Sequence, residues 1–97
     1  MFWSRYLIKY VDHRVLNKFI WLLRDRGLWI ERHSYSFRLM YRNVIIGSLH
    51  IYPGFNEAVL KIHSVSESEA RELIETIESV FYKLFPDYKL FVQLDLG

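Results

Sequence analysis

Residues 66–85, SESEARELIETIESVFYKLF, decide the fold. Ser66 and Glu69 have the spacing of a capping box, in which each side chain accepts a hydrogen bond from the other residue's backbone N–H. Behind them, apolar residues recur at the three- and four-residue spacing of one helical face. They are Ala70, Leu73, Ile74, Ile77, Val80, Phe81, Leu84 and Phe85. Pro86 cannot continue a helix, so the stretch predicts a long amphipathic helix that ends there.

A second amphipathic helix is expected over residues 12–26, DHRVLNKFIWLLRDR. Asp12 suits the N-cap, and Gly27 suits the C′ position that follows the C-cap. Trp21 falls outside the apolar arc of this helix, on the side that carries Arg14 and Lys18. Helical phase therefore predicts that Trp21 is exposed. The arc itself is formed by Val15, Leu16, Phe19, Ile20, Leu22 and Leu23.

Strands are expected at both ends of the chain and between the helices. The alternation within residues 28–41 changes parity near His33 and Ser34, which indicates a bulge or a bend. The order β-α-β-β-β-α-β, with two helices that each have one apolar face, favours one α+β domain over residues 1–97. Its antiparallel sheet of about five strands has both helices on one face and leaves the other face open. The expected strands are residues 4–11, 28–41, 45–52, 57–63 and 88–95.

Apolar pairing predicts the register of two hairpins. A three-residue loop over 42–44 and a four-residue loop over 53–56 bring apolar residues opposite one another, whereas a slip of one residue would expose them. The expected pairs are Phe37–Leu49, Leu39–Gly47, Leu49–Leu60 and Ile51–Ala58.

The open face in this register is expected to be basic and partly apolar. Arg38, Ser48 and Lys61 form one row across it, flanked by Met40, Ile46, His50 and His63. The candidate nucleic-acid-binding residues on or beside this face are Arg5, Lys9, Arg38, Arg42, Lys61, Tyr52 and Phe91.

The composition excludes several classes of protein. The chain contains no cysteine, which excludes a disulfide framework and a thiolate metal site. The N-terminus lacks the order of a signal peptide, and no apolar run approaches the ~20 residues of a membrane span, so we expect a cytoplasmic protein. Residues 1–50 contain nine Lys/Arg and three Asp/Glu, and residues 51–97 contain four and eight. This asymmetry fits either two oppositely charged faces or a basic surface for a polyanion.

The sequence favours no enzyme, no catalytic residue and no cofactor. It contains no phosphate-binding glycine loop, no HExxH pair and no nucleophile elbow. His50 and His63 are expected on one face, but about four residues of strand, or ~13 Å, separate them, which is too far for one metal ion. We therefore expect no metal site.

Three segments carry a family resemblance: residues 58–64 (AVLKIHS), 66–71 (SESEAR) and 83–86 (KLFP). Together they resemble the end of one TATA-binding-protein repeat, and the expected order of elements is similar to one such repeat. Tyr52 falls where those repeats carry a wedging Phe. The resemblance implies a curved sheet whose concave face binds DNA through the minor groove. A saddle would need two copies, since the chain holds one repeat. The topology also resembles a ferredoxin-like plait with an added hairpin.

Two functions remain open at this point. The first is a nucleic-acid-binding protein, for DNA or RNA, whose basic residues hold phosphates while Tyr52 or Phe91 stacks on bases. The second is a protein-interaction module, a regulator or an inhibitor. Its partner interface is either the apolar sheet face or the surface of Trp21, Arg14 and Lys18. The surplus of aromatic and aliphatic residues also favours a homodimer.

Overall fold

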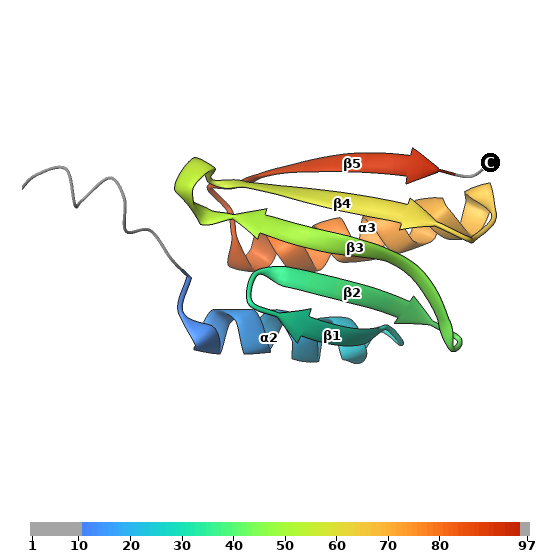
Figure 1. Cartoon of the computed structure of the whole chain (residues 1–97), viewed down its shortest axis with the longest axis horizontal. Helices are drawn as coiled ribbons and strands as arrows, with labels where there is room; N and C mark the ends of the chain where they lie inside the picture. The colour runs from blue at the N-terminus through green and yellow to red at the C-terminus, as the bar shows by residue number, and fades with distance from the viewer. Residues whose placement is uncertain (1–10, 96–97) are drawn as a thin grey trace, which may run out of the picture.

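Two helices cover one face of a five-stranded sheet in the computed structural model, which describes residues 11–95 (Figure 1). The expected α+β class is thereby confirmed, while residues 4–10 of the first expected strand lie outside the described residues. A short 3-10 helix, η1 (Pro53–Phe55), joins the third and fourth strands. The other elements are α2 (His13–Arg24), β1 (Trp29–His33), β2 (Ser36–Tyr41), β3 (Val44–Tyr52), β4 (Glu57–His63), α3 (Glu67–Leu84) and β5 (Lys89–Asp95).

The helices begin and end as their sequences predict. In α3 the Ser66 hydroxyl accepts from the Glu69 N–H at 3.2 Å, and the Glu69 carboxylate accepts from the Ser66 N–H at 3.2 Å, which confirms the capping box. In α2 Asp12 accepts from a backbone N–H in the first turn. At the other end Gly27 has φ +91°, and its N–H and that of Leu28 bond back to carbonyls of the last turn. Gly27 therefore occupies C′ of a Schellman motif.

Residues 28–41 form a hairpin instead of one bent strand. β1 and β2 are antiparallel, with His33 opposite Ser36 and only Ser34 and Tyr35 between them. Ser34 has φ +56°, the left-handed conformation that reverses the chain. The change of parity in the sequence thus marks a tight turn, because the chain reverses between the two alternating runs.

The sheet has the order β1-β2-β3-β4-β5, and every neighbouring pair is antiparallel except β4 and β5. The expectation of a wholly antiparallel sheet is wrong at this edge. The chain leaves β4, returns along α3 behind the sheet and enters β5 in the same direction as β4 (Figure 1). A helical crossover of this kind joins parallel strands.

Both predicted hairpin registers are confirmed, including Leu49 opposite Leu60. The β2–β3 turn is shorter than expected, however, because Arg42 and Asn43 both have positive φ, as a two-residue type I′ turn requires. A bulge in β3 takes up the additional residue, so Leu39 still lies opposite Gly47. The bulge turns Ile46 into the core, where its exposure is 1%. Its expected place on the open face is therefore wrong, and Ile45 lies opposite Met40 instead.

Phe19 of α2 lies at the centre of the core and joins the three parts of the fold. Its ring makes edge-on contacts with Phe37 of β2 at 5.4 Å, Phe81 of α3 at 6.0 Å and Phe85 at 6.1 Å between centroids. Among the described residues every fully buried side chain is apolar. The core therefore lies entirely between the sheet and the helices, and the opposite face of the sheet stays available.

Candidate functional site

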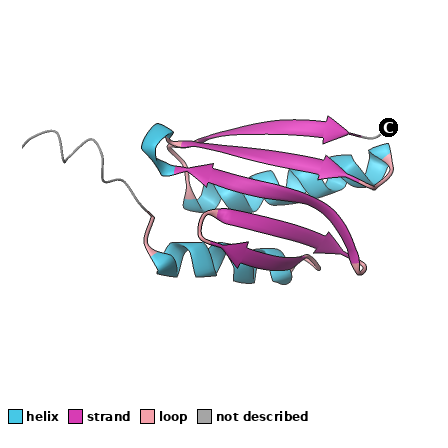
Figure 2. Ribbon diagram, viewed as in Figure 1, coloured by secondary structure: helices cyan, strands magenta, loops and turns pink. Residues whose placement is uncertain are grey.

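The helix-free face of the sheet is the candidate site, and Figure 2 shows both helices on the other side. Strand register orders its side chains into rows across the sheet. The middle row is Glu31, Arg38, Ser48, Lys61 and Gln93. The neighbouring row is His33, Ser36, His50, Val59 and Phe91, and the next is Tyr52, Glu57 and Lys89.

Aromatic rings gather toward the end of this face beside η1. The rings of His50 and Tyr52 lie 4.4 Å apart between centroids, and His50 shares a hydrogen bond with the Ser36 hydroxyl. Across β4, the ammonium of Lys89 lies 5.3 Å from the ring centre of Phe91. Tyr52 and Phe91 remain 42% and 41% exposed. Two flat aromatic faces with an adjacent cation are therefore available to a ligand.

The charge of the described part of this face is balanced, whereas the sequence predicts a basic face that also includes Arg5 and Lys9, outside the described residues. Glu57 lies opposite Lys89, and Asp95 lies diagonally from Lys61, one register position beyond Gln93 on the same face. Arg38 pairs directly with Glu31 at 3.3 Å, with both side chains more than half exposed. Glu31 was not expected there, because residues 28–41 were predicted as one strand and the β1–β2 hairpin is what brings Glu31 opposite Arg38. The cations are Arg38, Lys61 and Lys89, and the acids are Glu31, Glu57 and Asp95.

A shallow cavity of about 440 Å³ opens on this face over β1, β2 and β3 and reaches the end of β4. Its lining offers guanidinium, imidazole and hydroxyl groups, all of which can donate hydrogen bonds to an anionic or carbonyl oxygen. The polar residues that line it include Glu31, His33, Ser36, Arg38, Ser48 and His63. The cavity and the aromatic end together form a continuous polar and aromatic surface.

The residues proposed from the sequence fall into three groups. Arg38, Lys61, Tyr52 and Phe91 lie together on the open face. Arg42 does not join them. Arg5 and Lys9 lie outside the described residues.

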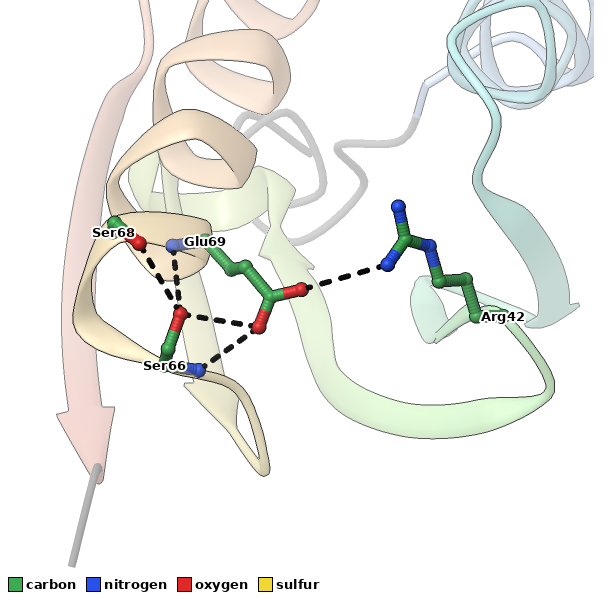
Figure 3. Close-up of polar contacts among 4 residues, drawn as sticks. All are labelled: Arg42, Ser66, Ser68 and Glu69. Atoms are coloured by element: carbon green, nitrogen blue, oxygen red, sulfur yellow. Dashed lines mark hydrogen bonds and ion pairs between the residues drawn. The ribbon is translucent and has the colours of Figure 1, made fainter.

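Arg42 lies in the β2–β3 turn, where its guanidinium is 4.0 Å from the carboxylate of Glu69 at the start of α3 (Figure 3). The same carboxylate accepts hydrogen bonds from the backbone and the hydroxyl of Ser66, and these bonds lower the pKa of Glu69. Arg42 is therefore directed toward the helix layer, away from the row of Arg38 and Lys61.

The exposed surface of α2 forms a second feature. Trp21 is 63% exposed, as helical phase predicts. The Arg24 guanidinium lies 4.4 Å from the ring centre of Trp29 and 5.8 Å from that of Trp21, and it donates to the carbonyl of Ile30 at 3.1 Å. Helical phase does not predict the contact of Arg24 with Trp29, because only the turn at Gly27 brings β1 beside α2. Two indole rings thus flank one cation.

Arg14 and Lys18 lie on the same exposed helix surface. The Arg14 guanidinium pairs with Asp12 at 2.9 Å. This hydrogen bond, together with one from the Arg14 backbone N–H, lowers the pKa of Asp12 to about 2. The charge of Arg14 is therefore already matched within the chain, whereas Lys18 makes no ion pair with a described residue.

The two histidines weighed as metal ligands have separate partners, since His50 bonds to Ser36 and His63 bonds to Ser64. Over residues 11–95, no three side chains of the ligand types gather at one point. Neither described helix has the length and apolar character needed to cross a bilayer. Comparison with protein-family models, curated proteins and solved structures finds no match for this chain.

Proposed function

We propose that the protein binds single-stranded nucleic acid across the helix-free face of its sheet. One observation carries the proposal: the register places exposed Tyr52 and Phe91 beside Lys89 and Lys61 on a face that no helix covers. Base stacking on such rings contributes about 1–3 kcal/mol per base and does not depend on the base identity. The adjacent ammonium groups supply phosphate contacts.

The balanced charge of the face favours a single strand over a duplex. A duplex binder relies on many phosphate contacts, which need a basic stripe. Here Glu31, Glu57 and Asp95 offset the three cations of the described face. Stacking therefore supplies the larger part of the affinity, and the cavity beside Arg38 accepts a phosphate or a base edge. The resemblance of residues 58–64, 66–71 and 83–86 to the end of a TATA-binding-protein repeat implies the same face of the sheet, although that family binds duplex DNA through the minor groove.

The test measures binding of a fluorescent oligothymidine to the full chain at several salt concentrations. With three phosphate contacts, the slope of log K against log salt is expected near −2, from about −0.7 per contact on a single strand. Arg38→Gln with Lys61→Gln should reduce that slope by about 1.4. Phe91→Ala should weaken binding about tenfold and leave the slope unchanged, because it removes stacking and no charge.

Two further variants sharpen the test. Glu31→Gln releases Arg38 from its ion pair and should tighten binding. Glu72→Gln with Glu75→Gln changes the same number of charges on exposed positions of α3 and should not weaken binding. Absence of binding at low salt, or an unchanged slope in the Arg38 and Lys61 variant, would contradict the proposal.

A protein-binding surface on α2 is the second candidate, and the Trp21–Arg24–Trp29 arrangement favours it. Trp and Arg are enriched among the residues that dominate the energy of protein interfaces. Trp21 and Arg24 belong to α2, and Trp29 belongs to β1, at the edge of the sheet opposite to β5. The Trp21 side chain can therefore act independently of Tyr52, Phe91 and Lys89. Trp21→Ala should abolish binding of a protein partner at this surface and leave oligothymidine binding unchanged. Arg38→Gln with Lys61→Gln should weaken oligothymidine binding and leave binding of the protein partner unchanged.

A further inference from the structure

β5 is an edge strand whose outer backbone groups are directed away from the sheet. The Lys89 N–H donates to the Asn56 carbonyl at 2.9 Å, on the β4 side, whereas the Leu90 N–H donates to the Tyr82 hydroxyl at 2.9 Å. Successive residues of a strand direct these groups to opposite sides. Val92 and Leu94 therefore direct their N–H and C=O groups outward, as Leu90 does. No strand of the described chain lies beyond this edge.

The apolar side chains of β5 are covered incompletely. Leu90, Val92 and Leu94 share the helix side of the sheet, since side chains alternate along a strand. Their exposed fractions rise from 8% through 36% to 51%. An edge that combines free backbone groups with exposed apolar side chains is a template for pairing with another strand.

We propose that this edge pairs with β5 of a second copy, antiparallel, about a two-fold axis at Val92. The sequence of β5, KLFVQLD, is complementary to itself in this arrangement. Lys89 lies opposite Asp95, Leu90 opposite Leu94, and Phe91 opposite Gln93. Both ends of the pairing then join opposite charges, while the apolar residues meet on the helix side.

The backbone geometry fits the same axis. A hydrogen-bonded antiparallel pair needs outward N–H and C=O groups on both residues, and Val92 has them on both copies. The Leu94 N–H of one copy can donate to the Leu90 carbonyl of the other. The Leu90 N–H stays with Tyr82, so this pairing leaves the contact between β5 and α3 in place.

Neighbouring registers lose the charge complementarity. An axis at Phe91 places Asp95 opposite Asp87, and like charges opposite each other destabilise a sheet. An axis at Gln93 places Asp95 opposite Phe91, so the carboxylate faces an aromatic ring and no longer lies directly opposite Lys89. Only the axis at Val92 therefore pairs both charged ends of the strand. The result is a closed, two-fold dimer whose continuous sheet joins the five described strands of each copy.

The first experiment measures the mass of the full chain by light scattering and sedimentation between about 1 and 500 μM, without nucleic acid. A dimer is expected within this range. Val92→Lys places two ammonium groups together at the axis and should weaken the dimer at least tenfold. Val44→Lys is the matched control: Val44 is also a partly exposed valine, but it lies beside the β2–β3 turn, and its substitution should leave the dimer intact.

The second experiment tests the register by charge reversal. Lys89→Glu alone brings two carboxylates together, and Asp95→Lys alone brings two ammonium groups together, so each should weaken the dimer. The double variant restores opposite charges at both ends and should recover most of the lost affinity. Circular dichroism should show the same fold in all three variants, because Lys89 and Asp95 are exposed.

Three outcomes overturn the proposal. The first is a monomer throughout the concentration range, which is also the result expected if another segment of the same chain covers the edge. The second is a dimer that Val92→Lys leaves unchanged, which would locate the interface elsewhere. The third is a double charge variant that is weaker than either single variant, which excludes the axis at Val92.

Discussion

β4 and β5 are neighbouring seven-residue strands with similar alternation but very different burial. On the helix side of β4, Ala58, Leu60 and Ile62 are at most 1% exposed. On the same side of β5, exposure rises to 51% at Leu94. β4 has a strand on each side and helices behind it, whereas β5 is the last strand of the sheet (Figure 1). Alternation thus indicates which way a side chain points, while its neighbours in space determine how much water it loses.

The largest effect is expected from comparing Leu60→Ala with Leu94→Ala. Removing the Leu60 side chain leaves a cavity in a close-packed core and should lower the free energy of unfolding by about 2–5 kcal/mol. Leu94→Ala should cost less than about 1 kcal/mol in the monomer, because half of that side chain is already in water. Urea unfolding at low micromolar protein concentration measures both values.

Protein concentration sharpens this comparison. If β5 pairs with a second copy, Leu94→Ala should lower the free energy of unfolding more at high protein concentration than at low concentration. The effect of Leu60→Ala should depend less on protein concentration, because Leu60 lies in the core of each copy. Equal costs for the two substitutions at every concentration would show that β5 is buried as deeply as β4, in contradiction to the burial described above.

An intermediate effect is expected at Gly47 of β3, which leaves no room for a side chain beside the backbone of β4. A Cβ at this position would lie 1.8 Å from the Lys61 carbonyl oxygen, and φ is +156°. Gly47→Ala must therefore move backbone, and it should lower the free energy of unfolding by at least about 1–3 kcal/mol. Gly54→Ala is the matched control, since a Cβ there meets nothing within 4 Å. Equal free energies of unfolding for the two variants would contradict the close contact between Gly47 and the Lys61 carbonyl.

The smallest effect is expected at the exposed capping box of α3. Hydrogen bonds from Ser66 lower the pKa of Glu69 in the folded chain, so the ionised carboxylate favours folding above its unfolded pKa of about 4.3. That contribution is lost as the pH falls through the lower, folded pKa. Glu69→Gln should therefore have a lower Tm than wild type at pH 7, and the difference should shrink toward pH 2.5. Thermal scans with Glu75→Gln as control measure this difference.

The candidate site could be predicted only in part. The apolar pairs across the hairpins were sufficient to bring Arg38, Ser48 and Lys61 into one row, because a slip of one residue would bury charge. The residues that β5 adds to the open face could not be placed in this way. Their positions depend on the α3 crossover, which makes β5 parallel to β4 and brings Lys89 beside Glu57 and Phe91 beside Val59. The pairing of Arg38 with Glu31 likewise required the β1–β2 hairpin, whereas the alternation predicts one bent strand over residues 28–41.

The sequence alone determined the helices, their caps and the two hairpin registers, because these depend on spacing within short segments. Each helix cap acts within one turn: the capping box of α3 joins Ser66 and Glu69, and α2 has Asp12 at its start and Gly27 at its end. The hairpin loops likewise join strands that are adjacent in the sequence. Tertiary structure decided the parallel pairing of β5, the bulge that turns Ile46 inward, and the association of Arg24 with Trp29. Each depends on which segments become neighbours when the apolar faces of both helices pack on one side of the sheet, and local spacing does not specify those neighbours.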